Sequence, residues 1–318
     1  MLASLTAVRA DDSTIALGMG GVRFAKSADI RMAAEDLRIS PVKVDVRFAF
    51  VNDSAKDIDA DVAFPLPDID TGEFWAAPLG TVTNDPVNFV DFKVTSDGHP
   101  VAFTADQRAF MKGKDVTAII KAAGVPINVS MGNINALDNA SAAQKKMLAK
   151  AGLAQIDGDN TIPQWTIRTR FHWKQHFPAG KAVVIEHSYQ PVTGGTFFGP
   201  DDITAKGSDD RFKKAFCMDE PTLARLHRIL TAIANRPADD KHPSGSMLQI
   251  DTTEYVLSTG NNWKGPIGKF HLTLDKLKPE NTLSLCWDGE LKKTGPATFE
   301  FTRENYAPAR DVRMVVLR

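Results

Sequence analysis

The sequence predicts a mainly β protein with two β-sandwich-like domains, a short helical insert in the first and one amphipathic helix in the second. Short segments of alternating apolar and polar residues recur along most of the 318 residues, which is the period of a half-buried strand. Helical spacing is confined to two places along the chain. The length fits two domains better than one.

The first domain is expected over residues 11–200. Segments 44–51 and 58–64 alternate, and Pro65 ends the second because proline cannot continue a central strand. Segments 165–177 and 182–190 are expected as two further strands. The Pro-Ala-Gly-Lys run between them predicts a hairpin turn.

The helical insert is expected at about 105–155. Asp115 caps a first Ala-rich segment that Gly124 ends, and Ser141 caps a second that Gly152 ends. Both helices are short, which favours an insert over a bundle core.

The second domain, residues 201–318, is expected to be β-rich with one helix at about 221–235. Asp219 or Glu220 begins this helix and Pro221 lies in its first turn. Four residues at helical spacing form the apolar stripe that should pack on the domain's sheet: Leu223, Leu226, Leu230 and Ile233.

Residues 1–10 are interpreted as the remnant of a signal peptide. Val8 and Ala10 are small residues of the kind found before a cleavage site, and the sequence turns polar directly afterwards. A cytosolic N-terminus is the alternative. No window of 18 apolar residues follows, so no membrane-spanning segment is expected. This pattern favours a periplasmic or secreted protein in which order begins near residue 13.

The two cysteines, Cys217 and Cys286, are expected to form a disulfide within the second domain. They lie 69 positions apart and lack the spacing of a zinc site. In an oxidising compartment, closing so long a loop stabilises by about 4 kcal/mol on the chain-entropy model. Two unpaired buried thiols are the alternative.

Charge and motifs restrict the function. Lys and Arg total 38 against 39 Asp and Glu, for a net charge of −1, which gives no global field for nucleic acid or an anionic membrane. The sequence contains no G-x-S-x-G, H-E-x-x-H or Walker A run. These observations favour a protein that is not an enzyme.

A histidine face is the sharpest candidate site. His172 and His176 share one face of a strand, and a hairpin centred on Ala179 and Gly180 would place His187 and Glu186 opposite. Two or three imidazoles and a carboxylate could bind a transition metal. The alternative is a solvated strand face without metal, and no other cofactor is indicated.

Three further patterns have weaker functional interpretations. The run Asp57-x-Asp59-x-Asp61 fits the wet face of a strand better than a calcium loop, because position 6 is not glycine. Residues 157–161 favour a plain turn. Trp263, beside Asn262 in a Gly- and Asn-rich loop, is a possible ligand contact, with a core residue as the alternative.

Several local motifs together resemble one known family. They are FPLP at 64–67, DVTA at 115–118, FPAG at 177–180, EHSYQP at 186–191, FCMD at 216–219, TGNNWKGPI at 259–267 and LCWDG at 285–289. The chain resembles the bacterial exported family of unknown function numbered 4424, over nearly its whole length. The resemblance implies export and a β-rich fold, and it implies no reaction.

The sequence therefore favours an exported, non-catalytic binding or scaffold protein. Its partner would be an envelope protein or a small ligand. The alternative is a metal-binding protein or metal-dependent hydrolase that uses the histidine face.

Overall fold

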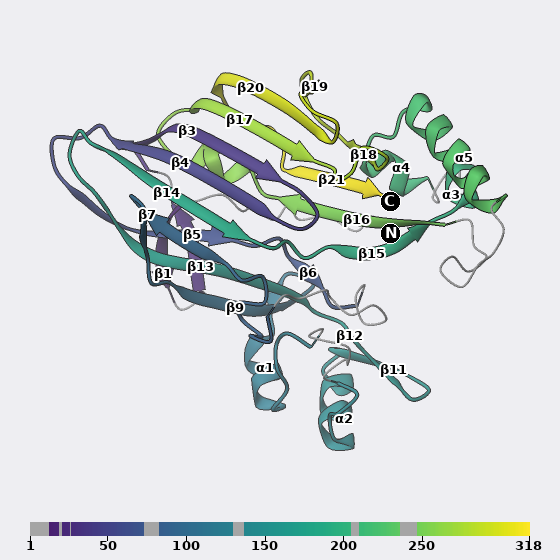
Figure 1. Cartoon of the computed structure of the whole chain (residues 1–318). Coiled ribbons are helices and arrows are strands. Elements are labelled where there is room, and N and C mark those ends of the chain that lie inside the picture. The colour runs from purple at the N-terminus through teal and green to yellow at the C-terminus, as the bar shows by residue number, and fades with distance from the viewer. Residues whose placement is uncertain are drawn as a thin grey trace.

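The computed structural model describes residues 13–18, 21–25, 27–72, 83–129, 137–204, 210–235 and 247–318, with backbone alone at 13–18, 21–25, 194–196 and 211. The fold is mainly β, with several sheets and a few short helices (Figure 1). The predicted signal remnant at 1–10 lies outside the described residues.

A seven-stranded sheet forms one layer. Its order is β10-β9-β13-β5-β1-β2, with β6 paired to β13. Its strands are β1 (Ser13–Gly18), β2 (Gly21–Ala25), β5 (Ile58–Pro65), β6 (Ile69–Asp70), β9 (Thr104–Met111), β10 (Lys114–Asp115) and β13 (Thr166–Phe177).

An eight-stranded sheet forms the layer above it (Figure 1). Its order is β19-β20-β17-β3-β4-β14-β7-β8. Its strands are β3 (Ile30–Ile39), β4 (Val44–Asn52), β7 (Lys93–Ser96), β8 (His99–Pro100), β14 (Ala182–Tyr189), β17 (Ile267–Asp275), β19 (Lys292–Lys293) and β20 (Thr298–Tyr306). Because β3 and β17 pair in parallel, this sheet contains strands from both halves of the sequence. The expected boundary near residue 200 therefore falls between strands that share a sheet.

The four-stranded sheet has the order β15-β16-β21-β18 and carries helices on one face. Its strands are β15 (Gly194–Phe198), β16 (Leu248–Tyr255), β18 (Thr282–Leu285) and β21 (Val312–Leu317); a 3₁₀ turn, η1 (Ser258–Asn262), follows β16. The helices are α3 (Pro200–Thr204), α4 (Arg211–Ala215) and α5 (Glu220–Ala234). In Figure 1 they lie together at one end of the molecule.

Helix α5 confirms the helix expected near 221–235. The Asp219 carboxylate accepts a hydrogen bond from the Thr222 backbone N–H at 2.9 Å, which caps the first turn. Of the predicted stripe, Leu226 and Leu230 are buried. Leu223 and Ile233 are partly buried against the same cluster, which includes residues of β15, β16 and β21.

The helical insert projects from the seven-stranded layer (Figure 1). It contains α1 (Thr117–Ala122), α2 (Ala142–Lys150) and a separate hairpin of β11 (Ala154–Asp157) and β12 (Asn160–Pro163). Ser141 and Gln144 form a capping box at the start of α2, and Gly152 follows its end with φ +73°.

Aromatic rings fill the space between the two large sheets. Phe64 of β5 lies 4.8 Å from the His187 ring of β14, and Trp173 of β13 lies 5.3 Å from the same ring. Phe92 stacks on Phe171 at 4.4 Å. Strand β13 buries every second residue, as its alternating sequence predicts.

Candidate functional site

The segment at 178–181 connects two sheets and does not form the expected hairpin. Strand β13 pairs with β5, β6 and β9, whereas β14 pairs with β4 and β7. The side-chain amide of Asn52 donates to the Phe177 carbonyl at 2.9 Å, and the backbone carbonyl of Asn52 accepts from the Gly180 N–H at 2.9 Å. Asn52 thus holds the turn against the end of β4, where the chain crosses to the other layer.

This crossing separates the residues of the expected histidine face. His172 and His176 lie on the outward face of β13, whereas His187 is buried between the layers. Glu186 is exposed and lies 3.6 Å from the Arg47 guanidinium. Among the described residues, no group of three or more His, Cys, Asp or Glu side chains is placed to hold a metal ion.

His176 instead lies in an exposed polar cluster with two aspartates. Its Nδ1 lies 2.8 Å from Asp59 and its Nε2 lies 3.6 Å from Asp57. Asp61 lies 3.6 Å from the Lys174 ammonium. The Asp57–Asp61 run therefore covers the solvent-exposed side of β5 and the residue before it, as its alternation predicts. Residues 158 and 159 form the plain turn expected between β11 and β12.

His187 is a neutral core residue. The rings of Phe48, Phe64, Phe92 and Trp173 surround it at centroid distances of 4.8–5.5 Å. Burial lowers the pKa of His187 to about 3, because the imidazolium would lose its hydration there.

Trp263, which the sequence suggested as a ligand contact, is instead a buried core residue. Its side chain is 0% exposed, and its ring centroid lies 4.4 Å from that of Phe50. The backbone fixes the loop on both sides: Ser27 N–H donates to the Asn262 carbonyl at 2.7 Å, and Lys264 N–H donates to the Ile30 carbonyl at 2.9 Å. The Nδ2 of Asn262 is buried too. These contacts turn a loop of surface composition into part of the core.

The Cys217–Cys286 disulfide is present. The two Cα atoms lie 5.0 Å apart, inside the range that a disulfide requires. The bond joins the turn between α4 and α5 to the residue directly after β18, so it ties the entry of α5 to the sheet that the helix covers.

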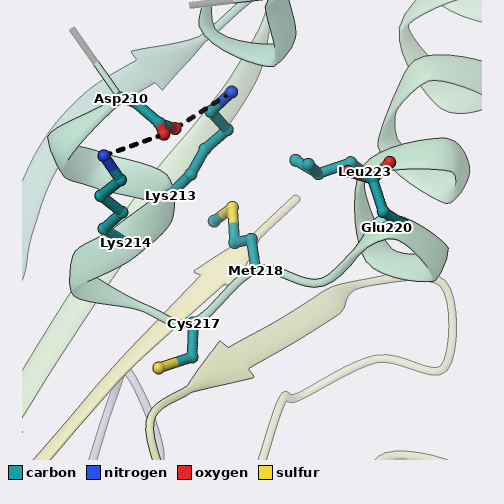
Figure 2. A pocket seen from close by; sticks show the side chains of 7 residues that line it. All are labelled: Asp210, Lys213, Lys214, Cys217, Met218, Glu220 and Leu223. Atoms are coloured by element: carbon teal, nitrogen blue, oxygen red, sulfur yellow. Dashed lines mark ion pairs between the residues drawn. The ribbon is translucent and has the colours of Figure 1, made fainter. Parts of the chain in front are cut away.

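A surface cleft of about 480 Å³ opens beside this disulfide (Figure 2). The residues that line it come from the end of the segment before α4, from α4, from the turn and from α5: Asp210, Lys213, Lys214, Cys217, Met218, Glu220 and Leu223.

The charges of the cleft are arranged around Asp210. Its carboxylate lies 3.1 Å from the Lys213 ammonium and 3.4 Å from that of Lys214, as the dashed lines in Figure 2 mark. These contacts, first the hydrogen bond with Lys213, lower the pKa of Asp210. Lys213 also donates to the Ile203 carbonyl at 2.9 Å, whereas the side chain of Lys214 is 69% exposed. Glu220 places an acidic group on the α5 side.

A buried acid lies between the eight-stranded and four-stranded sheets. Glu35 of β3 is 1% exposed, and Tyr255 of β16 donates its hydroxyl to Glu35 Oε1 at 3.4 Å. Among the described residues, Oε2 has no hydrogen-bond partner. Burial raises the pKa of Glu35 to about 8, and the hydrogen bond from Tyr255 opposes this only in part. Burial, with Asp288 and Glu35 contributing, also raises the pKa of Tyr306.

Comparison with known proteins identifies the family. The family model described as "Domain of unknown function (DUF4424)" matches residues 10–315. The chain belongs to this family. A search of curated proteins finds no match.

Among solved structures, a candidate nutrient binding protein from Legionella pneumophila has a TM-score of 0.47 at 15% identity, covering 97% of this chain and 70% of that one. An M1 zinc metallopeptidase from Deinococcus radiodurans has a TM-score of 0.30 at 6% identity, covering 92% of this chain and 43% of that one. This DUF4424 chain thus spans less than half the length of the metallopeptidase.

Sequence reasoning missed three charged arrangements. The cleft draws on segments that the sequence does not mark as one site, although Cys217 and the start of α5 pointed to its location. Glu35 gave no signal because its buried neighbours lie on other strands. The third is Arg168 on the outward face of β13, which binds Asp68 through two guanidinium nitrogens and lies 4.3 Å over the Phe110 ring.

Proposed function

We propose that this DUF4424 protein is a non-catalytic binding protein of the periplasm or the secreted fraction, and that the cleft beside the disulfide holds its ligand. The observation that carries the proposal is a cleft with charges of both signs over apolar side chains. Ligand sites are concave, with apolar walls and a few polar groups that orient the ligand. The disulfide supports the compartment, because such bonds persist in oxidising environments.

The charges of the cleft favour a small ligand that carries both an anionic and a cationic group. Lys214 is the more exposed cation, so a carboxylate or phosphate could share it with Asp210. Glu220 would receive the cationic group from the α5 side. Met218 and Leu223 would contact an apolar body between the two ends. The volume of about 480 Å³ suits a molecule of the size of an amino acid or a short peptide.

Calorimetry and thermal-shift measurements on the oxidised chain would test this proposal. Leucine and methionine are the zwitterionic probes, and glucose is the neutral probe. We expect the amino acids to bind and glucose not to bind. Lys214→Ala and Glu220→Gln should each weaken binding about tenfold, because each removes one charge contact of about 1–2 kcal/mol. Lys181→Ala is the matched control, since this exposed lysine lies in the turn after β13.

Two results would contradict the proposal. One is binding that is unchanged in both Lys214→Ala and Glu220→Gln, which would place the ligand elsewhere. The other is the absence of both calorimetric binding and a thermal shift with either amino acid at millimolar concentration, which would show that the cleft takes no zwitterionic ligand of this size.

A further inference from the structure

Cys217 occupies a backbone position that favours glycine. It directly follows the C-cap of α4, Phe216, and has φ +49°. The Cys217 N–H donates to the Lys214 carbonyl at 3.3 Å, and the Met218 N–H donates to the Lys213 carbonyl at 3.0 Å. This pair of bonds is the Schellman ending of a helix, in which the left-handed residue is usually glycine. A cysteine here is held in a conformation that its side chain disfavours.

The disulfide also lies at the surface. Cys217 is exposed and lines the cleft, and Cys286 is half-buried. Figure 2 places Cys217 in the open turn between α4 and α5. Exposed disulfides are reached by external thiolates and are the labile members of their class, whereas structural bonds are shielded.

The half-buried sulfur has acceptors in contact. The Sγ of Cys286 lies 3.6 Å from the Ala215 carbonyl oxygen and 3.7 Å from that of Lys214. A thiol at Cys286 would therefore find hydrogen-bond acceptors as soon as the disulfide is cut.

We propose that the Cys217–Cys286 bond is a thiol–disulfide exchange site, whose reaction partner is a dithiol reductant such as an oxidoreductase with two active-site cysteines. A thiolate of the partner attacks Cys217 Sγ, forms a mixed disulfide there and expels the Cys286 sulfur. That sulfur takes a proton from solvent. The second thiol of the partner loses its proton and attacks the mixed disulfide, which releases Cys217 as a thiolate and leaves the partner oxidised. One disulfide is broken and one is formed, and two electrons pass to the protein.

Other contacts keep α5 on the sheet when the bond is open. Arg225 donates to the Glu280 carbonyl at 2.7 Å and to the Thr282 hydroxyl at 3.1 Å. Ser284 donates to the Phe216 carbonyl at 2.9 Å. Leu226 and Leu230 stay in the helix-covered cluster. Reduction would therefore loosen the α4–α5 turn and the cleft wall without unfolding the chain. This exchange does not depend on the identity of the cleft's ligand.

The test measures how fast the native oxidised chain is reduced. Dithiothreitol is added in buffer and in a series of sub-denaturing urea concentrations, and thiols are trapped with a maleimide and counted by mass spectrometry. We expect a rate within about tenfold of that in fully denaturing urea and independent of the sub-denaturing urea, since local access needs no unfolding. A rate that rises with urea in proportion to the unfolded population would overturn the proposal. The double variant Cys217→Ser with Cys286→Ser reports labelling that does not come from this bond.

A second measurement locates the attack. The oxidised chain is treated with reduced glutathione, quenched with the maleimide and digested. We expect glutathione on Cys217 and the maleimide on Cys286, with hydrogen exchange rising in the α4–α5 segment and unchanged in β13. Glutathione on Cys286, or a general rise in exchange across the sheets, would contradict the proposed order of steps.

Discussion

Glu35→Gln should remove a pH dependence that a single buried carboxyl imposes on the whole fold. Glu35 faces Tyr255 from the four-stranded sheet and influences Tyr306 of β20. Its neighbours on the adjacent strands, Phe48 and Phe270, bring no charge. Glu35 is 1% exposed, and burial disfavours its charged form, so the neutral acid is favoured in the folded state.

The sign of the effect follows from the two pKa values. Glu35 has a pKa of about 8 in the fold against 4.5 as a free side chain, so between these values the folded state holds a proton that the unfolded state has lost. The associated stability is complete below pH 4.5 and is lost as the pH rises toward 8. Each pH unit in this interval changes the folding equilibrium about tenfold, which sums to a loss on the order of 5 kcal/mol.

Urea unfolding of the disulfide-bonded chain, followed by tryptophan fluorescence from pH 5 to pH 8, would measure this loss. We expect the stability of Glu35→Gln relative to wild type to rise with pH across this range. Near pH 5 the variant should be less stable by about 1–3 kcal/mol, because its amide NH₂ occupies the position of Oε2, where the fold offers it no acceptor. Glu304→Gln, on the exposed face of β20, is the control and should follow wild type. Parallel curves for wild type and Glu35→Gln would refute the reasoning.

Three further predictions concern the core, α5 and the outward face of β13. Between pH 6.5 and about 3, only the unfolded state protonates His187, so the wild-type free energy of unfolding should fall by a total on the order of 5 kcal/mol as the pH is lowered through this range. His187→Leu should remove this loss of stability. Equal midpoints of acid unfolding for variant and wild type would contradict the prediction. Leu226→Ala should destabilise by about 2–5 kcal/mol and the half-exposed Leu223→Ala by less, and an unaltered melting temperature for Leu226→Ala would show that α5 is peripheral. His176→Ala should cost less than about 1 kcal/mol, because its partner Asp59 is 82% exposed; a larger loss in urea unfolding would show a structural role.

Local patterns in the sequence predicted the local elements well. The Asp219 cap, the proline in the first turn and the leucine spacing place α5 within one residue of the expected bounds. These signals act over one or two helical turns, so no knowledge of distant contacts is needed. The alternation in β13 and the cap at Ser141 succeeded for the same reason.

Strand pairing could not be predicted from the same patterns. Segments 165–177 and 182–190 have the composition and spacing of a hairpin, but Asn52 binds the turn and each strand joins a different sheet. The alternation of apolar and polar residues predicts which side chains of a strand are buried. It does not predict which other strand pairs with it. The histidine face depended on that pairing, which is why it was not assembled. Trp263 failed similarly, since backbone contacts from distant segments bury its loop.

The residues that most distinguish this chain are those that break a local rule. Glu35 places a carboxyl where the inner face of β3 otherwise has apolar side chains, and Cys217 stands where a helix ending favours glycine. Neither residue is favourable for stability on its own. In each case the position is occupied by a contact with a residue far away in the sequence: Glu35 accepts a hydrogen bond from Tyr255, and Cys217 forms a disulfide with Cys286. Exceptions to local preference that persist in a consistent fold are expected at functional sites. Both exceptions involve the four-stranded sheet: Glu35 contacts its strand β16 through Tyr255, and Cys217 ties the start of α5 to the end of its strand β18. A change in redox state would therefore act first on the α4–α5 turn beside the cleft, whereas a change in pH would act through Glu35 on the contact between the two sheets.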